Sequence, residues 1–251
     1  MNALLSVATG IFSDSLQKNM STLEKWWPDS IHAWTDLLPP GSPTHAEQPY
    51  AFKAFAMKWA FDAGYQTATW IDSIVHMEGS PSRYLAELHT VGYYFQNNGF
   101  NCAQTCSDKM LFHYRVERDQ AARMVEVVGG FWGLHARYRD FVDELVENSK
   151  LGLFSGAREH STQDSSDSRF LFCRHDQSLM SLMVNMRRWK ISDGPGSFFN
   201  YRTNKDCVRP VECFVAGHAR RGNPSASGTR TRSPLGPIRV LNGGFIPPIL
   251  H

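Results

Sequence analysis

Short apolar runs recur along the first third of the chain, and each is typical of a buried β-strand. They cover Leu4 to Ala8, Ser30 to Trp34 and Thr67 to Ile71. The third run is rich in β-branched and aromatic residues and follows the helix-ending pair Ala63-Gly64. These features favour a strand buried in a mostly parallel sheet.

Apolar residues spaced three or four positions apart predict the helices that connect these strands. One helix is expected over Ser13 to Trp27. A second is expected to open at Pro49, where a missing N–H costs nothing, and to run to Asp62. The segment Leu37 to Gln48 contains consecutive prolines and a glycine, so it must be a loop.

The second half of the chain continues with shorter elements. Val127 to Leu134 is expected to be one glycine-punctuated strand, and glycine inside a strand often marks the close approach of a ligand or another backbone. Gly130 could in this way form part of a substrate or acceptor site. The other expected elements are a helix from Ser80-Pro81-Ser82 to Thr90, a strand over Val91 to Phe95, a turn over Gln96 to Gly99, a helix over Tyr138 to Asn148, and a strand-like run from Arg169 that leads into a helix carrying Leu179, Leu182 and Met183.

Two polar positions stand directly after predicted strands. Asp72 and Ser73 follow Thr67 to Ile71, and ligands of open α/β sheets bind outside the carboxyl ends of strands. Hard oxygen ligands at such a place suit Mg²⁺ or Mn²⁺ bound to the phosphates of a substrate. The alternative is an Asp-Ser turn or helix cap without a metal. Thr9 and Gly10 follow the first strand, where a small residue lets the backbone approach a nucleotide.

Two further residues have both a structural and a functional interpretation. Asp176 stands at the start of a predicted helix, so it is either an N-cap or a carboxylate at the mouth of the sheet that carries Asp72. Lys53 lies near the start of the helix before Asp72, and it could either reach a phosphate or be solvated.

The overall composition describes an ordinary soluble globular protein of 251 residues, with 42% hydrophobic and 20% charged residues. The formal net charge of +2 argues against global steering toward nucleic acid or an anionic membrane. The five cysteines are scattered, which favours reduced core thiols, although Cys102 and Cys106 could share a metal. The N-terminus lacks the basic region of a signal peptide and no apolar run is long enough to span a bilayer, so a cytoplasmic location is expected.

The composition changes from Gly217 onward. Arginines there alternate with Gly, Ser, Pro and Thr, and no acidic residue is present. Such a stretch cannot bury enough apolar surface to fold by itself. The chain is therefore expected to consist of one domain over 1–216 and an irregular basic tail over 217–251. The tail could cover a phosphate-bearing substrate, contact nucleic acid, or be merely solvated.

Three segments together resemble the GT-A glycosyltransferases of the nucleotide-diphospho-sugar transferase superfamily. They are Gln48-Pro49-Tyr50-Ala51-Phe52-Lys53 with the helix that follows, Gly64-Tyr65 running into Trp70-Ile71-Asp72-Ser73, and Arg174-His175-Asp176-Gln177-Ser178-Leu179-Met180-Ser181. The second is similar to the strand-end acidic motif of this family, usually D-x-D, which holds the metal. The third is similar to the D-Q-x-x-L-[NS] segment of glycogenin-like transferases. One departure is that Ile74 stands where the second Asp of D-x-D would be.

The resemblance implies a Rossmann-type mixed, mostly parallel sheet flanked by helices, and transfer of a sugar from a nucleotide-diphosphate donor, such as a UDP-sugar, to a hydroxyl acceptor. It assigns Asp72 to Mn²⁺ or Mg²⁺, with help from Ser73, and it leaves His175 either as a metal ligand or as a structural histidine. Asp176 with Gln177 would lie beside the sugar. Thr9, Gly10, Lys53 and Gly130 would contact donor or substrate.

Two other functions stay open at this stage. A catalytically silent module would keep nucleotide-sugar or partner binding on the same scaffold, and the incomplete acidic motif favours it. A nucleic-acid-modifying enzyme would grip its acceptor with the arginine-rich tail, although no recognised nucleic-acid motif accompanies those arginines.

Overall fold

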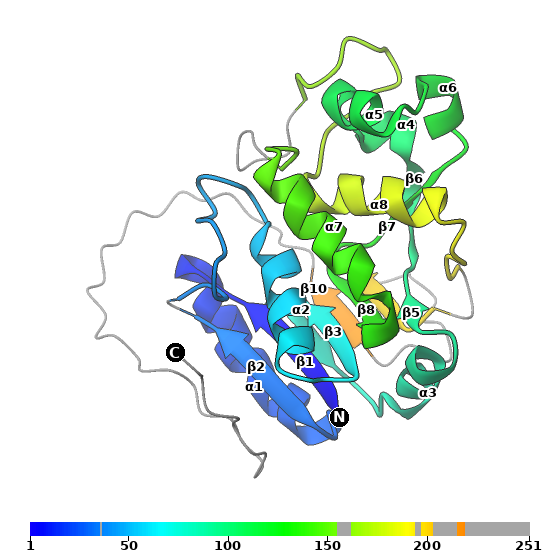
Figure 1. The fold of residues 1–251 in the computed structure, drawn as a ribbon. Coiled ribbons are helices and arrows are strands. Elements are labelled where there is room, and N and C mark those ends of the chain that lie inside the picture. Colours follow the sequence, from blue (N-terminus) through cyan, green and yellow to red (C-terminus); the bar gives the residue numbers. More distant parts are fainter. Residues whose placement is uncertain (36, 155–161, 194–196, 203–214, 219–251) are drawn as a thin grey trace.

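The centre of the fold is a five-stranded sheet in the order β2-β1-β3-β8-β5 (Figure 1). The computed structural model describes residues 1–35, 37–154, 162–193, 197–202 and 215–218. In it β1, β2 and β3 pair in parallel, whereas β8 is antiparallel to both β3 and β5. All strands of this sheet except β8 therefore share one direction, which confirms the predicted α/β class with a mixed, mostly parallel sheet flanked by helices.

The bounds of the elements agree closely with the prediction for the first third of the chain and less closely afterwards. The strands are β1 Asn2–Val7, β2 Ser30–Trp34, β3 Thr67–Ile71, β4 Val75–Met77, β5 Tyr93–Tyr94, β6 Asn97–Asn101, β7 Val125–Val127, β8 Phe131–His135, β9 Phe199–Arg202 and β10 Val215–His218. The helices are η1 Gly10–Phe12, α1 Ser13–Trp26, α2 Phe52–Asp62, α3 Ser82–Thr90, α4 Cys102–Thr105, α5 Asp108–Tyr114, α6 Arg118–Ala121, η2 Ala136–Tyr138, α7 Arg139–Lys150 and α8 Asp176–Met186.

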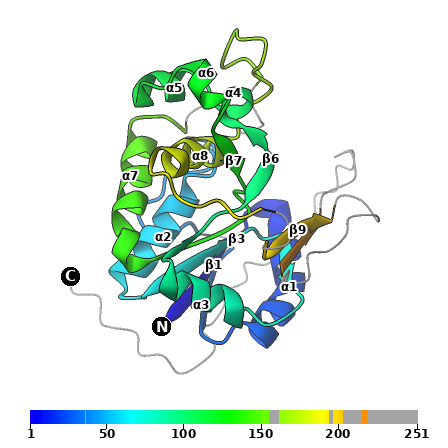
Figure 2. The ribbon, with the colours of Figure 1, turned by 90° about the vertical axis from the view of Figure 1, so that its right-hand side faces the viewer.

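Both faces of the sheet are covered, which explains why its strands are almost continuously apolar. Along β1, Ala3, Leu5 and Val7 belong to the core on the side of α2, α7 and α8, while Leu4 packs on the side of α1 and α3. This alternation follows from the two-residue period of a strand. Figure 2 shows α2 and α7 on one side of the sheet, and α4, α5 and α6 together at one end of the molecule.

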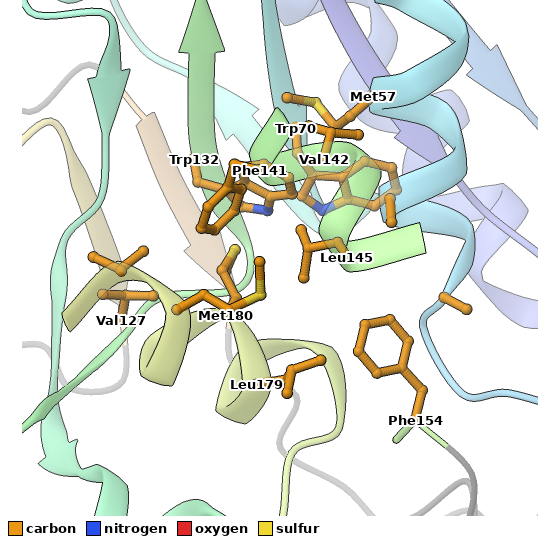
Figure 3. Packing of buried hydrophobic residues seen from close by; sticks show 14 of the residues in the cluster. Met57, Trp70, Val127, Trp132, Phe141, Val142, Leu145, Phe154, Leu179 and Met180 are labelled. Carbon is orange, nitrogen blue, oxygen red and sulfur yellow. The ribbon is translucent and has the colours of Figure 1, made fainter. Parts of the chain in front are cut away.

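The larger core contains a pair of tryptophans from neighbouring strands. Trp70 of β3 lies opposite Trp132 of β8 in register, and both side chains are 1% exposed. Figure 3 shows them beneath Phe141 and Val142 of α7, with Met180 of α8 nearby. The central strands are therefore held from one face by α7 and α8.

Position 133 in β8 is a glycine because a larger side chain would not fit there. A Cβ built at this position would lie 2.1 Å from the Oη atom of Tyr84 and 3.2 Å from Oγ1 of Thr69. Tyr84 is fully buried on α3, and its hydroxyl hydrogen bonds to that of Thr69 at 2.9 Å. The close approach predicted for this strand is therefore made by a buried side chain of α3.

Three predicted boundaries in the second half are wrong. The segment over 127–134 is two strands, because Val128, Gly129 and Gly130 separate β7 from β8 and the two strands belong to different sheets. The predicted turn over 96–99 overlaps β6, whose pairing with β7 is irregular and accommodates Gly99 at a φ of 85°. The run before Asp176 forms no named strand, and it lies against α4 through Leu171 N–H, which donates to the carbonyl of Gln104.

The second helix begins later than predicted. Pro49 lies in a turn, and α2 starts only at Phe52. Tyr50 between them has a φ of 64°, in the left-handed region that no helical residue adopts. Pro49 therefore does not occupy the first helical position.

The predicted tail begins inside a strand. Strand β10 crosses the boundary between residues 216 and 217 and pairs with β4 and β9, so Gly217 and His218 belong to a small three-stranded sheet. Residues 219–251, with all the arginines of the tail, lie outside the described residues. Cys102, Cys106 and Cys173 are buried free thiols, as expected, while Cys207 and Cys213 are also outside the described part. None of the helices in the described ranges is long and apolar enough to cross a membrane.

Candidate active site

Asp72 is fixed at the carboxyl end of β3 by bonds to neighbouring strands. Its N–H donates to the carbonyl of Gly130 at 2.9 Å, and its own carbonyl accepts from the N–H of Val75 at 2.8 Å, which closes a tight turn. The indole Nε1 of Trp70 donates to Asp72 Oδ1 at 2.8 Å. The side chain remains 29% exposed. The carboxylate is therefore held from the core side and reaches solvent on the other.

Lys53, the second residue of α2, brings the two predicted carboxylates together. Its Nζ atom lies 3.3 Å from Asp72 Oδ1 and 3.1 Å from Asp176 Oδ2, and it donates to the carbonyl of Gly129 at 3.0 Å. An ammonium group has three N–H donors, so these three oxygens match its full capacity. The predicted convergence of Asp72 and Asp176 is confirmed, and the Lys53 ammonium pairs with both carboxylates.

Asp176 is the more buried of the two carboxylates. It is the first residue of α8, and 8% of its surface is exposed. Burial raises the pKa of this carboxyl group above its ordinary value, and the negative charge of Asp72 adds to this, while Lys53 acts in the opposite direction. The structural interpretation of Asp176 as an N-cap is wrong, because His175 occupies the N-cap position and Asp176 is the first helical residue, where it pairs with Lys53.

Gln177, Gly129 and Gly130 connect this site to β8. The N–H of Gly129 donates to Gln177 Oε1 at 3.0 Å, while the carbonyl of Gly129 accepts from Lys53 Nζ. A Cβ on Gly129 would lie 2.8 Å from Gln177 Oε1 and 3.0 Å from Gln177 Cβ. Only glycine allows this approach without displacement. Gly129 thus contacts Gln177 directly and the ion-paired Lys53 through its carbonyl, and Gly130 contacts Asp72 through its carbonyl.

A cavity of about 230 Å³ opens beside these charges. Its polar lining comes from Thr9, Lys53, Asp72 and Ser73, all predicted as site residues. The other side is aromatic, with Phe12, His45, Tyr50, Phe52 and Trp70. The cavity therefore combines an apolar, ring-rich wall with one ammonium and one carboxylate, which is the usual make-up of a small-molecule site.

Five predicted site residues do not line this cavity, namely Gly10, Gly130, His175, Asp176 and Gln177. Gly10 is exposed, with a φ of 58°, directly after Thr9. His175 is 1% exposed, and its ring stacks on Tyr50 with centroids 6.0 Å apart. His175 therefore supports the cavity wall from behind, in keeping with the structural interpretation of this histidine.

The contacts around Asp72 do not fit a resident Mn²⁺ or Mg²⁺. The ammonium of Lys53 occupies the point where the two carboxylates meet. Within the described ranges there is no group of three or more His, Cys, Asp or Glu side chains that could hold a metal ion. Metal binding by Asp72 and His175 stays a prediction from the family resemblance, without a matching donor set.

The sequence did not reveal several residues of the site. His45 and Tyr50 belong to the proline-rich loop and the turn after it, whose path no local pattern predicts. Glu126 of β7 is fully buried near Gln177, and it accepts from Asn98 Nδ2 at 2.6 Å. Burial raises the pKa of Glu126, and Arg174, with Nη1 at 3.8 Å, acts in the opposite direction. The sequence of β7, Val125-Glu126-Val127, did not predict that its carboxylate would be buried at the site.

No protein-family model and no curated protein sequence matches this chain. Among solved structures, one that is similar is a glycosyltransferase involved in the glycosylation of the major capsid of PBCV-1. The TM-score is 0.49 at 10% sequence identity, and the match covers 86% of this chain and 91% of the other. The function proposed below therefore depends on the contacts of the site and not on this similarity.

The buried carboxylate predicts a pH dependence of stability. Well below pH 4, Asp176 is protonated in both the folded and the unfolded wild type. As the pH rises, the unfolded chain ionises first because burial raises the pKa in the folded state, so the wild type loses stability. The free energy of unfolding of Asp176→Asn should therefore rise relative to wild type between about pH 4 and pH 7. Urea unfolding at both pH values measures this.

Asp62→Asn is the matched control with the opposite sign. Partial burial raises the pKa of Asp62, but hydrogen bonds from Lys58 and Arg139 outweigh it and lower the pKa. Asp62→Asn should therefore lose stability relative to wild type as the pH rises from acid. If Asp176→Asn behaved in the same way, the stated effect of burial on Asp176 would be contradicted.

Proposed function

We propose that this protein is a glycosyltransferase that moves a sugar from a nucleotide-diphosphate donor, in the first instance a UDP-sugar, to a hydroxyl acceptor. The observation that carries the proposal is the convergence of Asp72, Asp176 and Lys53 beside an aromatic cavity at the carboxyl ends of β1 and β3. That edge is where open α/β sheets bind nucleotides.

The cavity supplies suitable surroundings for the nucleotide part of such a donor. A nucleobase is flat and aromatic, and rings such as those of Phe12 and Tyr50 can pack against it. The first turn of α2 adjoins the cavity through Phe52 and Lys53, and the positive end of a helix favours phosphate. These features support a base bound among the rings and a diphosphate near the start of α2.

The charges of the site match the charges that develop in glycosyl transfer. The bond between the anomeric carbon and the diphosphate oxygen breaks, a bond from the acceptor oxygen to that carbon forms, and the acceptor proton passes to a base. Positive charge develops on the sugar ring and negative charge on the diphosphate. Two carboxylates can stabilise the former and one ammonium the latter, and groups fixed in advance do this most effectively.

Asp176 and Gln177 are proposed to lie beside the sugar. In an inverting reaction Asp176 would accept the acceptor proton, for which a raised pKa is favourable. In a retaining reaction it would orient the sugar. The bond from Gly129 to Gln177 fixes the amide in either case.

Calorimetric titration with UDP, UDP-sugars and other nucleotide sugars tests the proposal. We expect binding of at least one nucleotide sugar, and Phe12→Ala should weaken it by about tenfold because one wall of the cavity is lost. Phe112→Ala is the matched control, since this ring is 86% exposed on α5 and does not line the cavity. Absence of nucleotide binding by the wild type, or equal loss in both variants, would contradict the proposal.

A silent nucleotide-sugar-binding module is the second candidate. Ile74 replaces the second carboxylate of the acidic motif, and Lys53 is surrounded by three protein oxygens. Binding without any donor cleavage would favour this module over a transferase. The nucleic-acid hypothesis depends on the tail, which lies outside the described residues.

A further inference from the structure

We infer that Lys53 is the resident cation of the site, and that its ammonium group takes the place of a divalent metal ion between Asp72 and Asp176. The inference deepens the proposed function and rests on it for the catalytic consequence. Its central part, which cation the carboxylates bind, is independent of any substrate.

The geometry around Nζ is that of a bound cation. Three oxygens surround this atom: the Gly129 carbonyl at 3.0 Å, Asp176 Oδ2 at 3.1 Å and Asp72 Oδ1 at 3.3 Å. Two carboxylates and one carbonyl form the kind of hard oxygen set that otherwise binds Ca²⁺, Mg²⁺ or Mn²⁺. Here the same set is arranged around an ammonium group at ordinary hydrogen-bond distances.

The Lys53 side chain is also held in this place by its surroundings. The Lys53 side chain is 7% exposed, and its Nζ lies 5.4 Å from the centre of the Tyr50 ring and 5.5 Å from that of Trp70. Aromatic faces attract a cation, and both rings keep water away from it. Asp176 is buried and Asp72 partly exposed, and two carboxylates this close without a cation between them would repel each other, so the ammonium also stabilises the folded site.

The positive charge of Lys53 excludes a second cation from the same position. A divalent ion that bridged Asp72 and Asp176 would have to stand close to the position of Nζ, and like charges at such a distance repel strongly inside a protein. The two carboxylates can therefore bind either the ammonium or a metal ion, but not both. The catalytic consequence is that a bound nucleotide sugar would meet a fixed lysine and would need no added metal.

Manganese binding to variants of Lys53 tests this directly. Free Mn²⁺ is measured by electron paramagnetic resonance while purified protein is titrated without nucleotide. We expect no stoichiometric binding by wild type. Lys53→Met removes the ammonium but keeps a chain of similar length, so the three oxygens become available and Mn²⁺ should bind at least about tenfold more tightly than to wild type. The added substitution Asp72→Asn should abolish this gain.

Two control variants accompany the Mn²⁺ titration. Lys58→Met removes a lysine from the same helix that pairs with Asp62 on the surface, and it should leave Mn²⁺ binding unchanged. Lys53→Arg retains a cation and should also gain no Mn²⁺ site. Circular dichroism shows whether Lys53→Met is folded. If it is not, the titration of wild type and Asp72→Asn still decides the question.

Three results would overturn the inference. One is stoichiometric Mn²⁺ binding by wild type that Asp72→Asn removes. Another is a folded Lys53→Met that binds Mn²⁺ no better than wild type. The third is nucleotide binding by wild type that occurs with Mn²⁺ and disappears in EDTA. By contrast, a protein that binds no nucleotide under any condition would remove the proposed function, while the Mn²⁺ titrations would still report on Lys53.

Discussion

Asp72→Asn is expected to lower donor cleavage by at least about a hundredfold, as measured by release of the nucleoside diphosphate from the nucleotide sugar that binds best. The substitution keeps the size of the side chain and an oxygen that can accept from Trp70 Nε1. It removes the more exposed negative charge of the site and leaves the Lys53 ammonium facing a neutral amide oxygen, since Oδ1 contacts both Trp70 and Lys53. The positive charge that develops on the sugar would therefore lose a fixed partner, and the Lys53 ammonium would be held less firmly.

The matched control for this experiment is Asp62→Asn. Asp62 is the last residue of α2 and 47% exposed, and it pairs with Lys58 and Arg139 away from the cavity. Its loss should leave the cleavage rate within about twofold of wild type, because exposed ion pairs contribute little. Equal rates for wild type and Asp72→Asn would leave the transferase proposal without support. A hundredfold loss in Asp62→Asn as well would indicate a general structural effect.

Strands β1 and β3 could be predicted from the sequence because both of their faces are buried, whereas β2 is a half-buried edge strand. Thr67–Ile71 and Ser30–Trp34 have the predicted bounds. Residues of both faces must then be apolar, and the resulting run contrasts with the polar turns around it. The position of Asp72 at the end of such a strand follows directly from this pattern, which is why the sequence identified it.

The elements after Thr90 were harder to predict because tertiary contacts decide them. The segment over 127–134 contains apolar residues at both ends, yet Gly129 and Gly130 leave the strand to meet Gln177 and Asp72. No local pattern contains these partners. In the same way, Tyr50 adopts a left-handed conformation beside a proline that otherwise favours the start of a helix.

The ion-pair partners of Lys53 could not be predicted from its own position in the sequence. Its place near the start of α2 indicated a polar function, with either a phosphate or solvent as partner. The structure instead places it against Asp72 and Asp176, which are 19 and 123 residues further along the chain. Convergence of this kind depends on the packing of α2 and α8 against the sheet, and no spacing within the sequence encodes it.

That packing leads to the second large effect, which concerns stability. Trp132→Ala should lower the free energy of unfolding by about 3–5 kcal/mol, because it removes a large buried ring and leaves a cavity. The Trp132 side chain is 1% exposed, stacks on Phe95 with centroids 6.0 Å apart, and lies beside Trp70 in the core of Figure 3. Urea unfolding followed by circular dichroism measures the change.

Trp132→Phe separates the ring from its polar group. No described residue accepts a hydrogen bond from the indole Nε1 of Trp132, so phenylalanine retains much of the packing and removes a buried unpaired donor. The free energy of unfolding should therefore fall much less in Trp132→Phe than in Trp132→Ala. The surface control Phe112→Ala should change stability by less than about 0.5 kcal/mol. A loss below about 1 kcal/mol in Trp132→Ala would contradict a close-packed junction of β3, β8 and α7.

Because Trp70 also holds Asp72 through its indole, we expect the destabilised variant to lose order at the site before it unfolds.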